Sequence, residues 1–538
     1  MLPCILFEDE HLLAVNKPAG MNTHAPAPHA GEGMYEWLRD REPRWASLAI
    51  IHRLDKETSG VLLFSKTPLA NRSLTEEFTQ RRVGKKYWLA TDRQVSDDKH
   101  ITETAIVRSG AKYLARPVHP GADLAKTHFC ALAVPPVPFT SRMPGEIRWL
   151  EAAPATGRTH QIRVHAAHNG WPILGDALYG GTTASRLFLH AAELTLTHPA
   201  TGTSVIIRAP LDSWQTRGTD LRSAIIDPVE TDAYRLIHGV SDDQPGFFAD
   251  KLAGNLLVSS ARDFSAEKVR LHKFLAEQNG CESVWHKKLI RETTAAKPKE
   301  SSPRRWSGPG SGEPFLIREN GLQYELSFQE GYSVGLFLDQ RDNRRRLRHG
   351  YVASGFPSIA PNPGATLLNT FAYTCGFSVS AAAAGYQTTS LDLSRKYLDW
   401  GKRNFSHNHL NHTAHDFIFG DVIDWLARLA RKGREFDVVV LDPPTFSQSK
   451  QSGVFRAQKD YEKLVAAALR VLKKPGTLFA STNAAGWDPE EFCAAVKRAI
   501  ARTGRKSVAE HYSPQPPDFP ISREEPAYLK TVWHYLGP

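Results

Sequence analysis

From about residue 364 onward, short apolar segments alternate regularly with longer amphipathic segments. Strands separated by helices of this length indicate βαβ units, which build a parallel sheet covered by helices on both faces. No comparable helix separates the last two expected strands, so we expect the sheet to close with an antiparallel hairpin. The pattern predicts a seven-stranded, Rossmann-like α/β domain. Its expected strands are 366–371, 388–393, 416–419, 436–441, 477–481, 507–511 and 529–535, and its expected helices are 395–404, 423–432, 461–472 and 489–502.

The N-terminal region has a different pattern. Residues 1–212 alternate short apolar strands with turn residues, and the clearest of their few helical stretches is 69–82. This pattern predicts an α+β domain with a mainly antiparallel sheet.

A third pattern lies between these regions, in residues 220–340. Strand-like runs such as 254–259 and a helix near 266–278 predict a small α+β domain. Inside it, 297–314 is rich in Ser, Pro, Gly and Arg, so we expect a flexible loop there. The chain is therefore predicted to have three domains, the last of which is 341–538.

The composition limits the partners and the compartment. The net charge of +10 over 538 residues suits a polyanionic partner. The 5 cysteines are scattered without metal spacing or a disulfide framework, as is typical of a reducing cytoplasm. We find no signal peptide and no apolar run of membrane length, so we expect a cytoplasmic protein without a membrane partner.

One segment of the first domain concentrates charged residues around a carboxylate. Asp55 lies between basic neighbours in the segment IHRLDKETSG at 51–60, and an apolar run follows it. Nearby positive charge favours the ionised carboxylate, although an isolated segment of this kind is usually only an ion pair at a strand end. Three further motifs occur in order: NKPAG at 16–20, Lys86-Tyr87, and TGRTHQIRVH at 156–165. Together, over roughly the first 210 residues, they resemble the RluA-type pseudouridine synthases.

The resemblance implies a site that needs no cofactor, because uridine isomerisation moves no electrons and imports no group. It assigns Asp55 as the essential carboxylate, acting as nucleophile or base, and Arg163 as its cationic partner. Tyr87 is expected to stack on the base and to move the proton at carbon 5. A uridine in folded RNA must leave its stack to react, and Arg53 is expected to bind RNA at the vacated place.

Structural roles remain open for several of these residues. Tyr87 could be a core aromatic and Arg163 could form a purely structural ion pair. We expect His160 and His165 to be packing or backbone-bonding residues rather than catalysts.

A second candidate site lies at the strand ends of the α/β domain. The first strand runs into a turn of small residues, which lets a nucleotide approach the backbone. The dinucleotide fingerprint is absent. Asp392 ends the next strand, where it can accept both ribose hydroxyls, and Asp421 follows the third strand near the expected adenine edge. Each could instead be a helix N-cap, but together they favour a nucleoside. The expected binding residues of the turn are Asn369, Phe371, Thr374 and Gly376.

The fourth strand ends in Asp442-Pro443-Pro444, whose prolines fix the backbone and expose carbonyl oxygens beside a carboxylate. With the upstream run GLFLDQRDNR at 335–344, this motif resembles the RlmI/RlmKL-type 23S rRNA methyltransferases, from about residue 234 to the C-terminus. The resemblance implies a class I methyltransferase fold, S-adenosylmethionine as cofactor, and 23S rRNA or a large-subunit assembly intermediate as partner. The family's small N-terminal RNA-binding domain is not evident, and the synthase-like region takes its place. By this resemblance, the residues bordering the cofactor are Phe337, Asp339, Gln340 and Arg341, together with Asp442 and Pro443.

The methyl acceptor is less constrained. Methylation of carbon 5 of cytosine requires a cysteine thiolate, but Cys375 lies in the cofactor turn and Cys493 in an expected helix. The strand 477–481 continues without cysteine. The sequence Asp-Pro-Pro-Thr-Phe-Ser is more similar to the guanine nitrogen 7 branch of the family, so a ring nitrogen is the preferred acceptor and Asp442 its orienting group.

No metal site is expected. Four histidines between 407 and 415 have a spacing typical of a polar loop after a helix.

These observations favour a bifunctional RNA-modifying enzyme, and they leave three alternatives open. The methyltransferase half could make 5-methylcytosine. The chain could be a catalytically silent, RNA-binding ribosome-assembly factor. The C-terminal enzyme could also act on protein glutamine, although Asp442 rather than Asn before the two prolines argues against this.

Overall fold

The computed structural model describes residues 2–95, 98–119, 121, 124–133, 146–211, 216–261, 265–289, 302–310, 312–331, 333–449 and 453–538. The chain divides into two compact units. The first comprises Met1–Pro26, Gly33–Leu38 and Ser47–Asp227, and the second comprises Ala27–Glu32, Arg39–Ala46 and Pro228–Pro538. No helix among the described residues is long and apolar enough to span a bilayer.

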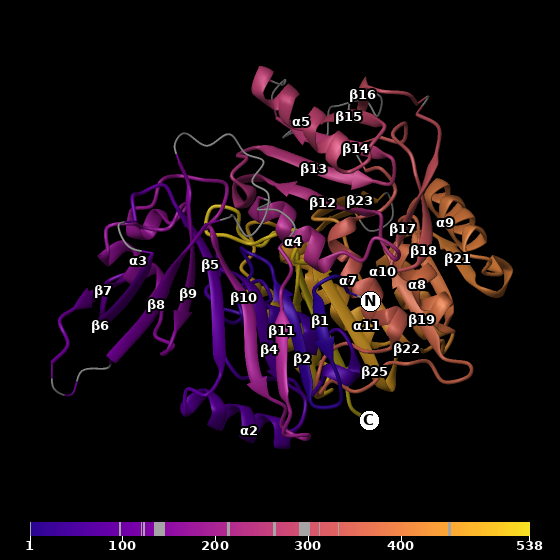
Figure 1. Cartoon of the computed structure of the whole chain (residues 1–538). Coiled ribbons are helices and arrows are strands. Elements are labelled where there is room, and N and C mark those ends of the chain that lie inside the picture. The colour runs from indigo at the N-terminus through magenta and orange to yellow at the C-terminus, as the bar shows by residue number, and fades with distance from the viewer. Residues whose placement is uncertain are drawn as a thin grey trace. The chain divides into compact units, whose positions relative to one another are not determined.

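The first unit is built on an 11-stranded sheet with the order β1-β2-β4-β10-β5-β9-β8-β6-β7 (Figure 1), to which β11 adds beside β10 and β3 beside β4. Between its described strands only β4 and β10 pair in parallel, so the expected mainly antiparallel sheet is present. The strands are β1 Ile5–Glu8, β2 Leu12–Lys17, β3 Ala49–Ile50, β4 Ser59–Ser65, β5 Gly84–Thr91, β6 Lys99–Ser109, β7 Lys112–Arg116, β8 Leu124–Leu132, β9 Arg148–Pro154, β10 Leu189–Thr197 and β11 Ser204–Arg208.

Helices cover parts of this sheet. Helix α2 (Pro68–Thr79) starts with Thr67 as N-cap and Pro68 in its first turn. It ends before the expected residue 82, because Arg81 has a left-handed backbone with φ 57°. The short helices of the first unit are α1 Met34–Arg39, α3 Gln161–His168, α4 Arg217–Ile225 and η2 Ala177–Tyr179, whereas η1 Pro43–Trp45 belongs to the second unit.

Helix α3 was not expected as a helix. It contains the QIRVH part of the third motif, and its apolar face packs Ile162 and Ala166 into a core with Trp171, Leu89 and Leu150. This tertiary contact compensates for the short length of the helix, which is marginal in isolation.

The second unit contains a five-stranded sheet with the order β12-β13-β14-β15-β16. Helix α5 (Ala266–Gln278) connects the parallel strands β14 and β15, as expected from the sequence. The strands are β12 Ala233–His238, β13 Phe247–Leu252, β14 Asn255–Ser260, β15 Ser283–Lys288 and β16 Arg304–Ser307, and the short helix η3 spans Gly239–Asp242.

The expected flexible loop 297–314 is wrong for part of its length. Arg304–Ser307 forms strand β16, which pairs antiparallel with β15. The surrounding Ser, Pro and Gly residues predicted a loop, whereas this strand forms because it pairs with β15. Residues 297–301 and 311 lie outside the described residues.

The second unit also contains a seven-stranded sheet with the order β21-β20-β19-β22-β25-β27-β26. The first five of these strands are parallel, and β27 pairs antiparallel with both β25 and β26. Every strand expected in this region is present within a few residues. The strands are β19 Thr366–Thr370, β20 Gln387–Asp392, β21 Asp416–Phe419, β22 Phe436–Leu441, β25 Leu472–Thr482, β26 Ser507–Pro514 and β27 Lys530–Leu536.

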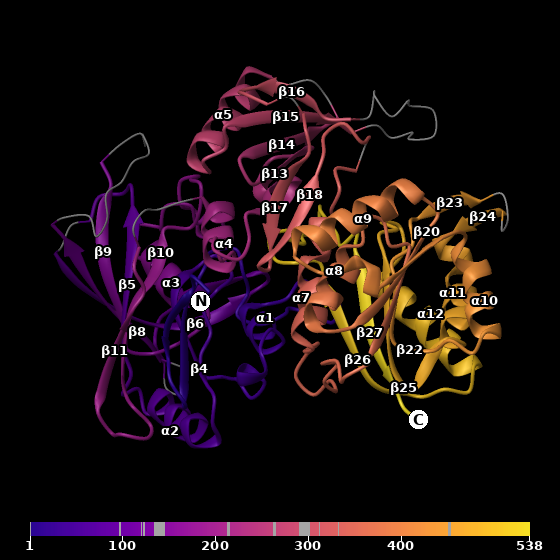
Figure 2. The ribbon, with the colours of Figure 1, turned by 90° about the vertical axis from the view of Figure 1, so that its right-hand side faces the viewer.

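Helices cover both faces of this sheet (Figure 2). On one face, Leu368, Val439 and Leu478 pack against α10, α11 and α12. On the other, the alternate residues Leu367, Val438 and Phe479 pack against α7 and α8, as the period of a strand requires. The helices are α7 Arg341–His349, α8 Gly376–Ala384, α9 Arg395–His407, α10 Val422–Arg431, α11 Ala457–Leu469 and α12 Pro489–Arg502, with η4 Leu338–Gln340 and η5 His412–Ala414. Two hairpins complete the unit: β17 Phe315–Glu319 with β18 Leu322–Leu326, and β23 Phe446–Ser449 with β24 Gly453–Arg456.

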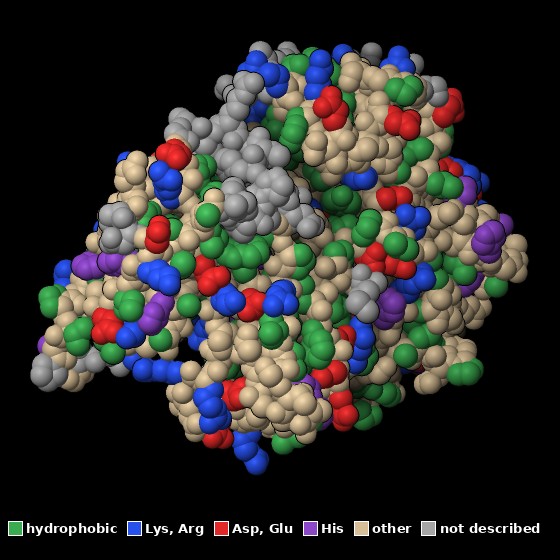
Figure 3. Space-filling model, viewed as in Figure 1, with side chains coloured by type: hydrophobic (Ala, Val, Ile, Leu, Met, Phe, Trp, Pro, Cys, Tyr) green, Lys and Arg blue, Asp and Glu red, His purple; other side chains and the backbone are tan. Residues whose placement is uncertain are grey.

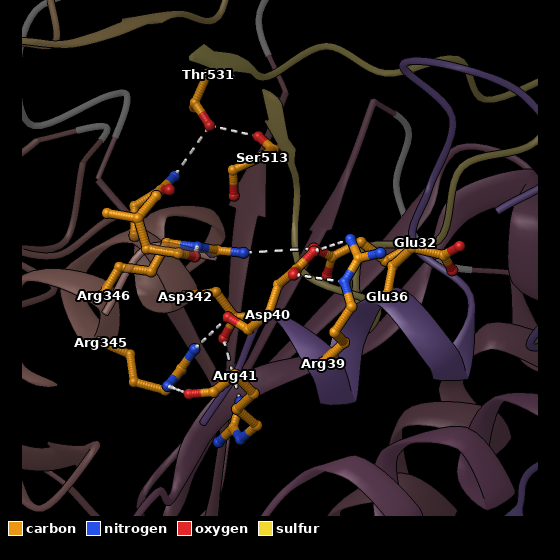
Figure 4. A network of polar contacts seen from close by, with 12 residues as sticks. Glu32, Glu36, Arg39, Asp40, Arg41, Asp342, Arg345, Arg346, Ser513 and Thr531 are labelled. Carbon is orange, nitrogen blue, oxygen red and sulfur yellow. Dashed lines mark hydrogen bonds and ion pairs between the residues drawn. The ribbon is translucent and has the colours of Figure 1, made fainter. Parts of the chain in front are cut away.

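Helix α7 carries a run of buried arginines that belong to a polar network of the second unit (Figure 4). Arg345 donates to the backbone oxygens of Asp40 and Arg41, and Arg346 contacts Glu32 at 3.3 Å. Glu32 and Asp40 also lie close to His511, in an arrangement that could hold a metal ion. Arg39 and Arg346 already bind these two carboxylates, so the arrangement is explained by ion pairing.

Candidate active sites

A cleft of about 930 Å³ in the first unit brings together the residues expected from the sequence motifs. Asp55 lies in the turn between β3 and β4, Tyr87 lies in β5, and Arg163 lies in α3. Arg53, an exposed residue, lines the same cleft. The first candidate site therefore unites side chains that are more than 100 residues apart in sequence, as the separation of 108 between Asp55 and Arg163 shows.

Hydrogen bonds from Lys17 of the NKPAG motif stabilise the backbone next to Asp55. The buried Lys17 Nζ donates to the backbone oxygens of Pro18, Met21 and Lys56, at 2.8, 2.7 and 3.1 Å. Burial lowers the pKa of Lys17 to about 7. Gly60, which follows the turn, has φ 114° and lies so close to β10 that a Cβ would come within 2.2 Å of the Ala191 oxygen. The NKPAG motif and this glycine thus fix the backbone on both sides of Asp55.

Arg163 joins two carboxylates. Its Nη1 lies 3.4 Å from Asp55 Oδ2, and its Nε and Nη2 each donate to Asp176 at 2.8 Å. Burial alone would lower the pKa of Arg163, but the hydrogen bonds and charge of Asp176, with the charge of Asp55, raise it above the usual value. The expected pairing of Arg163 with Asp55 is present. Asp176 was missed, since no motif spacing links it to α3.

Tyr87 lines the cleft, and its partly buried side chain packs against the core that also contains Leu89 and Leu150. Burial, and then the charge of Asp55, raise the pKa of its hydroxyl. The phenol is therefore protonated at neutral pH, when it could donate a proton.

The cleft is lined by more positive than negative side chains, which suits a phosphate backbone. Burial lowers the pKa of one of them, Lys85. On the face shown in Figure 3, basic and acidic side chains of the described residues are interspersed, so net charge alone does not mark a binding surface. The charged lining consists of Arg53, Lys56, Arg81, Lys85, Arg158 and Arg163 against Asp55 and Glu57.

The second candidate site lies at the carboxyl ends of the parallel strands in the second unit. After β19 the backbone is left-handed at Phe371, Tyr373 and Cys375, with φ of 54, 48 and 64°. Each such residue costs about 1–3 kcal/mol and is common at ligand-binding sites. Asp392 holds this turn, because its Oδ2 accepts from the Tyr373 amide at 2.8 Å and its Oδ1 from the Ser394 amide at 2.8 Å. Burial raises the pKa of Asp392 despite these bonds.

The other residues expected at this site either form buried hydrogen bonds beside the turn or lie at the start of a helix. The buried Asn369 donates to Ser378 Oγ at 2.9 Å, and the buried Thr374 donates to the Gly335 oxygen. Gly376 begins α8, where a Cβ would approach Leu336 to 2.8 Å. Asp421 is the N-cap of α10 and accepts from the Asp424 amide at 3.1 Å.

The upstream run 337–341 reaches the same edge of the sheet. Phe337 is 47% exposed, and its ring centroid lies 5.4 Å from that of Tyr373. Gln340 Nε2 donates to Asp442 Oδ1 at 3.2 Å and to Ser481 Oγ at 2.8 Å. Asp339 Oδ2 accepts from the Tyr528 hydroxyl at 2.8 Å.

Arg341 is placed differently from its neighbours. Its guanidinium forms two hydrogen bonds with the fully buried Asp518, at 2.9 and 2.5 Å. This ion pair fixes the position of the run, and the expected contact of Arg341 with the cofactor stays a prediction.

Asp442 follows β22 and is followed by the buried Pro443. Burial is the main cause that raises the pKa of Asp442 to about 6, and the charge of Asp339 adds to it. The pKa of this carboxylate thus lies about one unit below neutral pH. Gln340 and Ser481 are its hydrogen-bond partners.

Exposed apolar side chains gather at these strand ends, and the sequence patterns did not single them out. Leu393 follows β20, Phe419 ends β21, and Phe446 begins β23 shortly after Asp442. They are 40, 50 and 50% exposed. Exposed hydrophobic residues grouped in this way mark ligand-binding surfaces. All three lie at the edge of the sheet that also carries Asp392 and Asp442.

Cys375 lies in the turn after β19, and Cys493 lies in α12. Burial raises the pKa of Cys375 and of Cys493 to about 12, so both are thiols at neutral pH. His407 bonds Glu325 at 3.2 Å, and His415 Nδ1 bonds Thr388 at 3.0 Å.

Comparisons with known proteins identify both regions. Residues 11–168 match the family model described as RNA pseudouridylate synthase, and residues 234–532 match that described as S-adenosylmethionine-dependent methyltransferase. The second match spans more than half of the chain, so the chain belongs to the S-adenosylmethionine-dependent methyltransferase family. Its N-terminal region matches the RNA pseudouridylate synthase family, so the chain joins a pseudouridine synthase region to a methyltransferase region.

Individual relatives agree with this division. The chain is 32% identical over 335 residues to a ribosomal RNA large subunit methyltransferase of Deinococcus radiodurans, covering 60% of this chain and 79% of the relative. It is 38% identical over 224 residues to ribosomal large subunit pseudouridine synthase C of Yersinia pestis, covering 39% of this chain and 66% of the relative. The crystal structure of SMU.776 complexed with SAH is 26% identical, with a TM-score of 0.50, covering 64% of this chain and 88% of that one.

Proposed function

We propose that this chain modifies large-subunit ribosomal RNA in two ways, by isomerising a uridine to pseudouridine and by methylating a guanine ring nitrogen. The observation that carries the proposal is the presence, in one chain, of two sites with their charged groups in place. Asp55 contacts Arg163 in a basic cleft, and Gln340 contacts Asp442 beside a strained, cofactor-type turn. The names of the relatives support ribosomal RNA as the substrate of both.

In the first site, Asp55 acts on the ribose of the flipped uridine, as nucleophile or base, while Arg163 contacts its Oδ2. Tyr87, whose hydroxyl is protonated at neutral pH, stacks on the uracil and moves the proton at carbon 5. Arg53 is exposed at the mouth of the cleft and occupies the place that the uridine leaves in the RNA stack. No cofactor takes part in these steps.

In the second site, S-adenosylmethionine supplies an electrophilic methyl group. Asp392, which accepts from the Tyr373 amide, would also accept the ribose hydroxyls, and Asp421, the N-cap of α10, would lie at the adenine edge. Phe337, Asp339 and Gln340 border the cofactor, with Asn369, Phe371, Thr374 and Gly376 shaping the turn beneath it.

Asp442 orients the acceptor base. The Watson–Crick edge of guanine carries two N–H donors that an ionised carboxylate can accept, which leaves nitrogen 7 on the other edge for methyl transfer. The backbone oxygens next to Pro443 complete the polar rim. Cytosine carbon 5 would need a thiolate, whereas burial raises the pKa of both Cys375 and Cys493 to about 12.

We also propose the domain organisation expected from the sequence, with boundaries near residues 212, 220 and 340 and a class I methyltransferase fold in 341–538. The order of the seven-stranded sheet and its antiparallel end support that fold. The five free cysteines support a reducing, cytoplasmic compartment.

The test uses purified protein, labelled S-adenosylmethionine and rRNA from cells that lack the gene. Digestion to nucleosides and mass spectrometry should yield pseudouridine and 7-methylguanosine. A 5-methylcytosine product would reject the ring-nitrogen proposal, and the absence of both products would favour a silent assembly factor.

A further inference from the structure

His160 lies at the edge of the first site, beside Asp55. Its backbone is left-handed, with φ 56° and ψ 20°, at the N-cap of α3. The sequence suggested packing roles for both His160 and His165, and the structure separates the two. His165 is buried and bonded to Thr104 and Thr127, as a packing residue would be. His160 instead lines the cleft.

His160 and Arg163 approach the same oxygen of Asp55. The Nε2 atom of His160 lies 3.8 Å from Asp55 Oδ2, and the Nη1 atom of Arg163 lies 3.4 Å from it. Both cation-capable groups therefore face Oδ2, which leaves Oδ1 as the oxygen that can turn to the ribose.

The other ring nitrogen of His160 is held by Tyr179. The Tyr179 hydroxyl oxygen accepts from the Tyr113 amide at 3.0 Å and lies 2.8 Å from His160 Nδ1. Its own proton is then available for Nδ1, and a neutral imidazole that accepts at Nδ1 must carry its proton on Nε2. Burial lowers the pKa of His160, although the charge of Asp55 opposes this, so the neutral form prevails at neutral pH.

The orientation of the imidazole ring is fixed by two aromatic edges. Its centroid lies 5.5 Å from Tyr113 at an interplanar angle of 72°, and 5.7 Å from Tyr179 at 89°. The charged and titratable groups that face it are Asp55, Arg163, Asp176 and Tyr179.

We propose that His160 is a positioning residue for uridine isomerisation, in which Tyr179 fixes the Nε2–H tautomer so that this N–H faces Asp55 Oδ2 and, with Arg163, orients Oδ1 toward the ribose. The inference rests on the proposed role of Asp55. A neutral donor at this place steers the carboxylate without adding a second full charge beside Arg163.

The first test compares side chains at position 160 in the full-length protein. The probe is a 23S rRNA transcript with tritium at carbon 5 of uridine, and the readout is tritium release in a single turnover. His160→Leu keeps the volume and removes the donor, so its rate constant should fall about 10- to 100-fold while RNA affinity is unchanged. His160→Gln can place an amide N–H near the position of Nε2, and it should recover most of the rate.

The matched control is His168→Leu, at an exposed histidine in the last turn of the same helix, which should react like the parent. Asp55→Asn is measured in parallel. If Asp55→Asn is active, the proposed isomerase function of this site is wrong. If Asp55→Asn is inactive but His160→Leu is fully active, only the role inferred for His160 is rejected.

The second test measures how the rate of a variant relative to the parent depends on pH. A purely structural role of His160 would leave this ratio independent of pH. Tyr179→Phe retains the ring but lacks the hydroxyl that fixes the Nε2–H tautomer of His160. The proton of His160 can then lie on Nδ1, so that the lone pair of Nε2 faces Asp55 and slows the reaction. Protonation of His160, whose pKa is lowered, restores an N–H on Nε2, so the deficit of Tyr179→Phe relative to the parent should narrow as the pH falls from about 6.5 to about 5. A deficit that stays constant over this range, or a His160→Gln rate no better than that of His160→Leu, would overturn the proposal.

Discussion

Replacement of Asp392 by Ala tests the placement of the cofactor. In the structure this carboxylate accepts from the amides of Tyr373 and Ser394, both at 2.8 Å, and in the proposed complex it also accepts two ribose hydroxyls. A hydrogen bond to a charged group contributes about 1.5–3 kcal/mol. The loss of two ribose bonds should therefore weaken binding by at least about 3 kcal/mol, which raises the Kd for S-adenosylmethionine at least about 100-fold.

Two variants separate this loss from a collapse of the turn. Asp392→Asn keeps an amide oxygen that can still accept from one backbone amide, and it should bind the cofactor with intermediate affinity. Asp416→Ala removes an exposed carboxylate that pairs with Arg434 at the other end of the neighbouring strand, and it should bind like the parent.

Isothermal titration calorimetry measures the affinities of the parent and the three variants, and thermal melting checks that each variant is folded. An unchanged Kd in folded Asp392→Ala would refute the placement of the ribose at the end of β20.

Three further predictions address the two reactions. Asp55→Asn removes the charge and nearly keeps the volume, so pseudouridine formation should fall by several orders of magnitude while methylation persists; retained isomerisation in a tritium-release assay would contradict this. Cys375→Ser should leave methyl transfer within a few-fold of the parent, because burial keeps the thiol protonated, and a covalent adduct between this cysteine and RNA would contradict the ring-nitrogen acceptor. Since the pKa of Asp442 is raised to about 6, kcat/KM for methylation should fall as the pH drops below that value and the carboxylate gains a proton. A pH profile that is unchanged in Asp442→Asn would assign the titration to another group.

The strands and strand ends of the α/β region could be predicted because buried parallel strands leave a strong local pattern. Each apolar run there is bounded by turn residues, and Asp392 and Asp442 directly follow such runs. The motif order in the N-terminal region likewise predicted that Asp55, Tyr87 and Arg163 converge on one cleft.

The remaining features depend on partners distant in sequence. Strand β16 forms because β15 offers an edge, and α3 forms because its apolar face meets a core. Arg341 and Asp518 are 177 residues apart in sequence, so no local pattern predicts their ion pair. The same holds for Tyr179, whose contact with His160 depends on the turn that follows α3.

The central claim, that one chain carries out both modifications, is tested most directly in cells. Ribosomal RNA from a strain lacking the gene, complemented with the parent, Asp55→Asn or Asp442→Ala, is mapped for pseudouridine and methylated bases by mass spectrometry. The account predicts that Asp55→Asn restores only the methylated guanine and that Asp442→Ala restores only the pseudouridine. Loss of both modifications in either variant, or recovery of both in each, would contradict two independent active sites.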